Sequence, residues 1–430
     1  MKNLEIKNKK PQLGAEKNIE PAIDMSEEPE ENKFREYVLK TVGKIPDKIT
    51  NEWFEEKISG LSASKDSIEL FKSEMFMRAG FCYQDLSECD LSDLSKENLA
   101  KLTFNSSTIW PSTDKMPAGF HPEQILARGK DPMLGIKELH QQGIDGSGIT
   151  IAVIDKSFQN KKHEEYSGTK IEIVDLFGYT RDTFHANGVL SNLCGQNIGV
   201  APGANVIHYN VTDSRLEQTE EHFTCLKDIL TRIKNGEEIK AVNISAMLVD
   251  PSDMLKEIGL NIEQVGLMSK EQKEKIREQL TPQIKALSQP ILQQLSELGC
   301  EVIDSPRFWD SGFTKCDFNH NTNELTPPSW NGIVETADQN AVAFVAAGKV
   351  IAELESDDGY KYEQSSSASW TIPQAVGMYT LALQQDPSLT WDQFVEISKK
   401  TSKLLDSGIR IAQPKEIIEL IKTRANKQEN

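Results

Sequence analysis

Hydrophobic positions from residue 131 onward alternate between short unbroken runs and helical stripes. The run Ile149–Ile154 (ITIAVI) is typical of a strand that is buried on both faces of a parallel sheet. Four more runs predict further strands, at Asn205–Asn210, Ile239–Met247, Cys300–Ile303 and Ala341–Ala347. Because predicted helices lie between these strands, we expect an α/β domain over residues 131–425, with a mostly parallel open sheet flanked by helices.

The clearest helix is predicted at Thr219–Asn235, where an apolar stripe ends at an Asn-Gly stop signal. Residues 253–299 form a second helical segment in this interpretation, interrupted at Pro282 and Pro290. A short tail, 426–430, follows the domain. In such a sheet, the functional site is expected at the carboxyl ends of the strands.

The first 130 residues follow other patterns. Residues 1–33 are dominated by Lys, Glu, Asn and Pro, which predicts a disordered charged tail. From Phe34, apolar residues recur at spacings of three and four in FREYVLKTV, ITNEWFEEKI and SIELFKSEMFMRAGF. Residues 34–130 are therefore interpreted as a mainly helical N-terminal accessory region, whose last part, 110–130, is a connector rich in turn residues.

A five-residue period runs through residues 81–109. Its apolar positions are Phe81, Leu86 and Leu91 and, after a slip of three residues, Leu94, Leu99, Phe104 and Ile109. This period is typical of a short pentapeptide-repeat coil. The alternative is a helix through Leu91, Leu94, Leu99 and Leu102, and both interpretations assign the segment to packing rather than chemistry.

Charge and cysteine content narrow the function classes. The chain has 430 residues, and 48 Lys and Arg against 66 Asp and Glu give a net charge of -18, which disfavours binding to nucleic acid or to an anionic membrane. The N-terminus MKNLEIKNKKPQLG lacks the apolar core of a secretory signal. The six cysteines show neither a CxxC pair nor metal-ligand spacing. We therefore expect a cytoplasmic protein with reduced thiols and no membrane segment.

Three segments of the chain contain candidate catalytic residues. Asp155 directly follows the strand ITIAVI, although taken alone it could be a turn former. His185 in DTFHANGVLSNLCG precedes a helix-like segment, although a lone histidine is more often structural. In SSSASWTIPQAVG, Pro373 favours a helix start, where a serine hydroxyl would lie beside free backbone N–H groups that can stabilise an oxyanion. A serine needs a base, and the base needs an acid that orients it.

Taken together, these segments resemble a known family. IAVID, the segment around His185, GVAPGA, VNIS and SASWTIPQAVG are similar, in this order, to successive blocks of the subtilisin-like serine proteases (subtilases), over roughly residues 135–425. The order Asp, His, Ser distinguishes this family from other triad hydrolases. SASWTIPQAVG is similar to the family's GTSMAxPHVAG, and this places Ser369 on the nucleophile.

The resemblance implies an intracellular bacterial type of serine endopeptidase. Ser369 would attack the scissile carbonyl of a peptide or protein substrate, His185 would act as general base and then general acid, and Asp155 would orient the imidazole. This chemistry needs no cofactor. Calcium is common in the family, but no acidic loop here has a recognisable ligand spacing, so we expect no specific metal site.

The sequence departs from the family pattern around the triad. Lys156-Ser157 follows the aspartate, where the family has Thr or Ser and then Gly, and DTFHANG replaces HGTHVAG. The substrate-cleft segment would be Ser245, Ala246 and Met247, where the family has Leu-Gly after the serine. A methionine in place of glycine would narrow the pocket for the residue before the cut and favour small residues there.

The family's oxyanion asparagine has no clear counterpart. EVIDS takes the place of the oxyanion strand, with VAFVAAGKV as the next strand, so Lys349 is not the counterpart. A donor would come from the loop 305–321, with Asp310 and Ser305 as candidates and Asn319 third. Loss of such a donor costs about 100- to 1000-fold in rate, which predicts a slow or substrate-restricted enzyme.

Two alternatives accompany this interpretation. The lack of a clear counterpart to the oxyanion asparagine is also consistent with a subtilase-fold pseudoprotease that binds peptides or regulates a partner. The first 130 residues could be an inhibitory prodomain, a folding aid or a targeting module. They lack the alternating strands of the family's compact propeptide, and this favours a retained accessory domain.

Overall fold

The computed structural model describes residues 43–63, 80–99, 101–159, 161–212, 215–261, 264–265, 268–319, 324–326, 340–354, 356–364 and 367–428. The predicted tail 1–33 lies outside these ranges, as do the helix predicted in FREYVLKTV and most of SIELFKSEMFMRAGF. The described helices of more than one turn are α2 (Asn51–Ala63), α5 (Pro122–Gly129), α6 (Ile136–Gln141), α7 (Phe184–Cys194), α8 (Arg215–Lys234), α9 (Ser252–Glu257), α11 (Lys270–Glu297), α12 (Ser305–Asp310), α13 (Ala368–Gln385), α14 (Trp391–Thr401) and α15 (Pro414–Gln428).

A five-stranded parallel sheet forms the centre of the molecule. Its order is β3-β4-β2-β5-β6, with β2 (Thr150–Lys156), β3 (Lys170–Asp175), β4 (Asn205–Val211), β5 (Ile239–Ile244) and β6 (Glu301–Ile303). Along β2, Ile151 and Val153 pack with α7 and α13, whereas Ala152 and Ile154 pack with α8 and α11. The strand is therefore buried on both faces, and the predicted α/β fold with a mostly parallel open sheet is confirmed.

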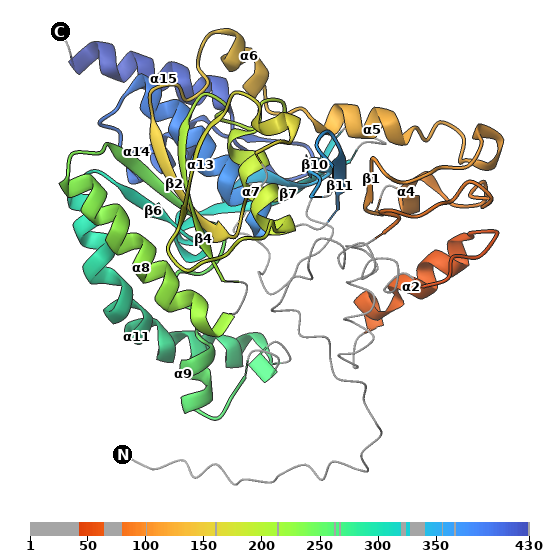
Figure 1. Ribbon diagram of the computed structural model, residues 1–430, viewed down its shortest axis with the longest axis horizontal. Coiled ribbons are helices and arrows are strands. Elements are labelled where there is room, and N and C mark those ends of the chain that lie inside the picture. Colours follow the sequence, from red (N-terminus) through yellow and green to blue (C-terminus); the bar gives the residue numbers. More distant parts are fainter. Residues whose placement is uncertain are drawn as a thin grey trace.

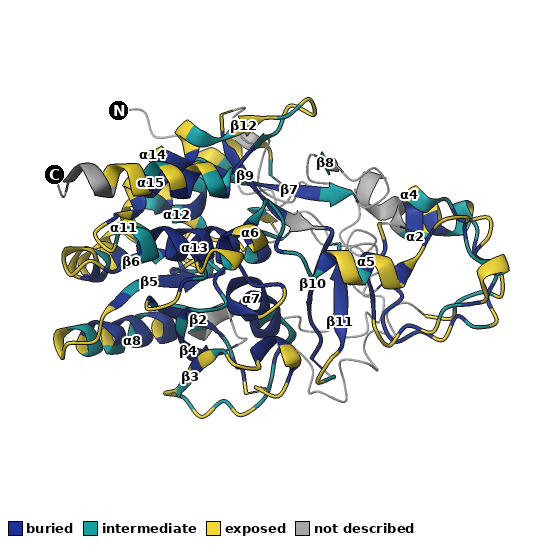
Figure 2. Cartoon of the chain, turned by 90° about the horizontal axis from the view of Figure 1, so that it is seen from above, coloured by how far each residue is buried: buried dark blue, intermediate teal, exposed yellow. Residues whose placement is uncertain are grey.

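Helices cover both faces of this sheet (Figure 1). Figure 2 shows α7 and α13 buried over almost their whole length, while α8 and α11 each present an exposed outer face. Within the described ranges, no helix combines the length and the apolar character that a membrane span requires.

A second, mixed sheet was only partly predicted. It contains β7 (Phe313–Asn319), β8 (Glu324–Thr326), β9 (Val342–Ala347), β12 (Lys403–Leu404) and β13 (Arg410–Ile411). The prediction that VAFVAAGKV directly follows EVIDS in the sheet is wrong, because β9 pairs with β7 and β7 stands between them in the chain. The sequence of β7, FTKCDFN, has too many polar residues to be recognised as a strand. Lys349, the first residue of β10 (Lys349–Ala352), is buried.

Three other boundaries differ from the predictions. Strand β5 ends at Ile244 rather than Met247, because the chain turns out of the sheet toward α12 and α13. Pro282 and Pro290 lie inside the continuous helix α11, where both are exposed, so the carbonyl groups that they leave without a partner can be hydrated. Helix α15 extends to Gln428, into the predicted tail.

The described accessory region contains α2, α5 and a turn-rich segment between them. Backbone N–H groups close turns that begin at Phe81, Leu86 and Leu91, and these three side chains are buried. The alternative helix through Leu91 and Leu102 is wrong, since among the described residues of that segment only α4 (Lys96–Leu99) is helical. Strand β1 (Phe104–Asn105) joins β10 and β11 (Tyr360–Glu363) in a three-stranded sheet, order β1-β11-β10.

Candidate active site

An aspartate and a histidine meet at the carboxyl end of the parallel sheet. Asp155 is the penultimate residue of β2, and His185 is the second residue of α7. Nδ1 of His185 lies 2.6 Å from Oδ1 of Asp155, and the N–H of Lys156 donates to the same oxygen at 2.8 Å. The fold thus brings together two residues that the sequence analysis singled out.

The start of α7 is fixed by Thr183, its N-cap residue. Its Oγ1 accepts the N–H of Ala186 at 3.3 Å, and both its hydroxyl and its N–H donate to the carbonyl of Ser157 at 3.0 Å. Because Ser157 lies in the loop directly after β2, these bonds tie the start of α7 to the end of β2. They determine where His185 lies relative to Asp155.

The charge state of Asp155 follows from its surroundings. The residue is 4% exposed, and burial alone would raise its pKa. The charge and hydrogen bond of His185 outweigh burial, with smaller contributions from His208 and from the N–H of Lys156, so the pKa of Asp155 lies below its usual value. The ionised carboxylate can then favour the tautomer that carries a proton on Nδ1 and can stabilise an imidazolium.

A second histidine, missed by the sequence analysis, lies behind this pair. His208 lies on β4, opposite Val153 of β2, and is completely buried. Its Nε2 donates to the carbonyl of Lys156 at 3.0 Å, and Lys156 in turn donates its N–H to Asp155. Burial lowers the pKa of His208 to about 4, so the ring is neutral near pH 7. A histidine within an apolar strand was the only sequence signal.

Ser369 is the second residue of α13, which begins at Ala368. The prediction that Pro373 marks the helix start is wrong, because Pro373 lies inside the helix, beyond its first turn. Ser369 donates its hydroxyl to the carbonyl of Ser245 at 3.1 Å and its N–H to Oγ of Ser367, the N-cap, at 3.2 Å. Among the described residues, it makes no hydrogen bond to His185. Catalytic hydrogen bonds are often loose before substrate binds, so this geometry is compatible with a nucleophile at rest.

Trp370 connects the serine to the histidine. Its ring centroid lies 5.6 Å from that of His185 and 5.8 Å from that of Phe184. Gly188, which DTFHANG shares with the family block, makes this packing possible, because a Cβ atom there would lie only 2.2 Å from the Trp370 ring. Helices α7 and α13 therefore approach closely beside the two candidate catalytic residues.

The predicted cleft segment lies next to Ser369. Ser245 is 5% exposed and contacts the Ser369 hydroxyl through its carbonyl, while the carbonyl of Ala246 accepts the N–H of Ser305 at 2.9 Å. The side chain of Met247 is partly exposed. Its effect on the pocket stays a prediction.

The oxyanion candidates are engaged elsewhere. Ser305 uses its N–H for Ala246, and its Oγ accepts the indole N–H of Trp309 at 3.1 Å. Asp310 is exposed and pairs with Arg277 at 3.4 Å, and Asn319 is the last residue of β7. Their role in an oxyanion site stays a prediction.

The residue that directly follows β6 is Asp304, which the sequence analysis did not consider. Its carboxylate accepts the N–H groups of Arg307 at 2.9 Å and of Leu248 at 3.2 Å, and burial raises its pKa. It caps α12 and ties it to the cleft segment. Among the described residues, no group of His, Cys, Asp and Glu side chains is arranged to hold a metal ion.

Comparisons in sequence and in structure give different results. In sequence, no protein family and no curated protein matches the chain. In structure, the chain is similar to the prenylagaramide maturation protease PagA, with 14% identity over 67% of this chain and 99% of that chain, and a TM-score of 0.44.

Two other solved structures are similar to the chain. One is a cold adapted subtilisin-like serine proteinase, with 17% identity over 62% of this chain and 89% of that chain, and a TM-score of 0.41. The other is the PatG macrocyclase in complex with peptide, with 11% identity over 67% of this chain and 95% of that chain, and a TM-score of 0.41. These likenesses concern the fold, whereas the roles of individual residues rest on the geometry of the site.

Proposed function

We propose that this chain is a serine endopeptidase that hydrolyses peptide bonds through an acyl-enzyme on Ser369. The observation that carries the proposal is the 2.6 Å contact between Asp155 and His185, with Trp370 packing the start of α13 against the histidine ring. The family resemblance of the surrounding motifs supports the same assignment of roles. The substrate would be a peptide or a protein.

In the proposed acylation, Oγ of Ser369 attacks the scissile carbonyl carbon and gives its proton to Nε2 of His185. This nitrogen has no hydrogen bond to any described residue, so it is available to a substrate-bound arrangement. The C–N bond then breaks as the imidazolium returns the proton to the leaving amine. Asp155 stays ionised throughout and stabilises the positive imidazole.

In deacylation, His185 takes a proton from water as the water oxygen attacks the ester carbonyl carbon. The ester C–O bond then breaks as the imidazolium returns this proton to Oγ of Ser369, and the carboxylic acid product leaves. The N–H of Ser369 is one expected donor to the negatively charged oxygen in both steps. In the resting structure this N–H is bonded to Ser367, so it must exchange that partner for the oxyanion. This exchange predicts a slow rather than an inactive enzyme.

Labelling with a fluorophosphonate tests the proposal, because only an activated serine reacts. We expect the wild-type chain and the surface variant Ser407→Ala to be labelled, and Ser369→Ala and His185→Ala to stay unlabelled. Mass spectrometry of the labelled peptide should place the adduct on Ser369. Absence of labelling in the folded wild-type chain at every pH tested would refute the proposed activity.

A second candidate function is a pseudoprotease that binds peptides without cleaving them. It is favoured by the two contacts of Ser369, whose hydroxyl and N–H are both bonded to the protein itself. It predicts that wild type and Ser369→Ala bind a peptide ligand equally and that neither is labelled. If the wild type is labelled and Ser369→Ala is not, the result supports the endopeptidase and contradicts the pseudoprotease.

A further inference from the structure

The accessory region and the catalytic domain share one sheet. Strand β1 of the accessory region pairs antiparallel with β11 of the catalytic domain. Ser106 extends the pairing, because its N–H donates to the carbonyl of Tyr360 and its Oγ accepts the N–H of Tyr360, both at 2.9 Å. Without β1, strand β11 would be an edge strand with unpaired backbone groups.

The two parts also share one hydrophobic core. Phe104 and Tyr362 are 0% and 1% exposed, and their ring centroids are 4.9 Å apart. Ile198 and Val350, from the catalytic domain, belong to the same buried cluster as the apolar side chains of residues 81–104. Separation of the parts would therefore expose apolar surface on both of them.

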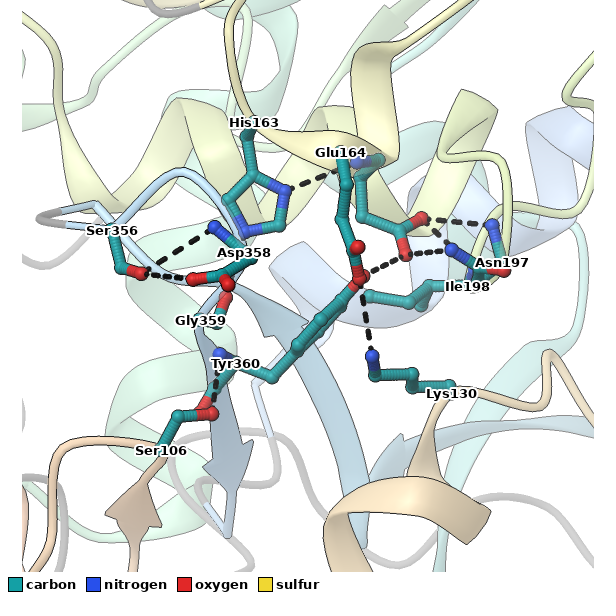
Figure 3. Close-up of polar contacts among 11 residues, drawn as sticks. Ser106, Lys130, His163, Glu164, Asn197, Ile198, Ser356, Asp358, Gly359 and Tyr360 are labelled. Atoms are coloured by element: carbon teal, nitrogen blue, oxygen red, sulfur yellow. Dashed lines mark hydrogen bonds and ion pairs between the residues drawn. The ribbon is translucent and has the colours of Figure 1, made fainter.

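Polar contacts also join the accessory region to the catalytic domain, and we call this boundary the junction. Nδ2 of Asn105 donates to Oε1 of Glu353 at 2.5 Å, and Glu353 is 2% exposed. Lys130, which follows α5, lies with Nζ 3.5 Å from the ring centroid of Tyr360 and 3.2 Å from Oε1 of Glu164 (Figure 3). Buried carboxylates lose much of their solvation, so the accessory region supplies hydrogen bonds that the catalytic domain alone would lack.

Tyr360 joins these contacts to the interior of the catalytic domain. Its hydroxyl lies between the carboxylates of Glu164 and Glu165, 2.6 Å from the latter. Glu165 is completely buried and accepts the N–H groups of Asn197 at 2.9 Å and Ile198 at 3.1 Å. Figure 3 shows the side chain of Glu164 beside the Tyr360 hydroxyl.

Strand β11 connects the junction to the candidate active site. Lys361, opposite Asn105 in the pairing with β1, is buried, and its Nζ lies 3.1 Å from Oε2 of Glu363. The same Nζ lies 3.9 Å from the ring centroid of Phe184. Phe184 directly precedes His185 and packs against Trp370. A shift of β11 would therefore move the ring that supports the catalytic histidine.

The described part of the accessory region does not contact the side chains of the candidate catalytic residues. Among the described residues, nothing in the range 80–130 forms a hydrogen bond, ion pair or ring contact with the side chains of Asp155, His185 or Ser369. An inhibitory segment would be expected to fill the cleft beside these groups. The contacts of residues 80–130 are instead with β11, Glu353 and Glu164.

We propose that residues 80–130 are a permanent part of the catalytic unit, which holds β11 in place and, through Lys361 and Phe184, positions His185. They are not a segment whose removal is needed for activity. The positioning role rests on the proposed function, whereas the permanent docking can be tested without it.

A cut in the full-length chain tests the docking. A recognition sequence for a site-specific protease, inserted at Gly119 in the exposed turn before α5, allows the chain to be nicked after folding. We expect both fragments to co-elute in native size-exclusion chromatography and to separate only in denaturant, with fluorophosphonate labelling unchanged. Release of the N-terminal fragment, or increased labelling after the cut, would overturn the proposal. An unlabelled intact chain would refute only the proposed function.

A double variant tests the positioning role. Lys361→Met with Glu363→Gln removes the buried ion pair without leaving a lone charge. We expect kcat to fall about 2- to 30-fold, the range that cation–π contacts span from exposed to desolvated sites, with KM and the thermal midpoint close to wild type. The single variant Lys361→Arg, which keeps the positive charge, should have a kcat close to wild type. The exposed control Lys101→Met should also leave kcat unchanged. An unchanged kcat in the double variant would overturn the positioning role.

Discussion

The hydrogen bond between Ser367 and Ser369 leads to a prediction with an unusual sign. In the resting structure, Oγ of Ser367 accepts the N–H that the proposed mechanism uses for the oxyanion, at 3.2 Å. Glycine at this position would have no side-chain oxygen to accept the N–H, which would then be free for the oxyanion. We therefore expect Ser367→Gly to be a faster enzyme than the wild type.

The magnitude follows from the bond that must be exchanged. A neutral hydrogen bond contributes a net 0.5–1.5 kcal/mol, about 2- to 13-fold in rate if the whole bond is lost before the transition state. Replacing a serine N-cap by glycine costs only a few tenths of a kcal/mol in stability, whereas alanine costs about 1 kcal/mol. Glycine is therefore the cleaner substitution.

The assay is steady-state hydrolysis of a fluorogenic peptide, together with the rate constant of fluorophosphonate labelling. We expect kcat and the labelling rate to rise while KM stays close to the wild-type value, because the N–H acts on the transition state rather than on the bound substrate. Ser269→Gly is the control, since Ser269 is also a serine N-cap but belongs to another helix, α11. An equal or lower kcat in folded Ser367→Gly would show that the resting bond does not limit the oxyanion site.

Three further predictions concern the residues around the site. Asp155→Asn should keep the fold but lower kcat about 10⁴-fold, because the amide favours the wrong imidazole tautomer; a kcat within tenfold of wild type would contradict the role of Asp155. Gly188→Ala should push Trp370 away from α7, costing about 1–3 kcal/mol of stability in chemical denaturation and lowering the labelling rate, and an unchanged labelling rate would count against the packing argument. Acid should destabilise the protein through His208, whose folded pKa of about 4 lies below its unfolded value of about 6.5. Between these values only the unfolded chain binds this proton, so the free energy of unfolding falls by about 3 kcal/mol as pH falls through the window. His208→Gln should flatten that dependence in urea titrations, and an unchanged slope would contradict it.

Much of the fold could be predicted because local patterns carry it. The run ITIAVI predicts a buried strand, and a carboxylate directly after it lies at the edge where sites form, as Asp155 does. The apolar run after Ser369 predicts helix α13, although the helix begins at Ala368 and Pro373 lies inside it rather than at its start. Strand β7 is not indicated by the sequence, because FTKCDFN contains too many polar residues to be recognised as a strand.

The sequence by itself determined the type of most elements and the order of Asp155, His185 and Ser369 along the chain. Only the tertiary structure decided that the Ser369 hydroxyl bonds to the carbonyl of Ser245 and that His208 bonds to the carbonyl of Lys156, the residue after Asp155. The same holds for the accessory region, which completes a sheet with β11. Periodicity and capping act between neighbours in the chain, whereas these contacts join residues that only the packing of helices and strands brings within hydrogen-bonding distance.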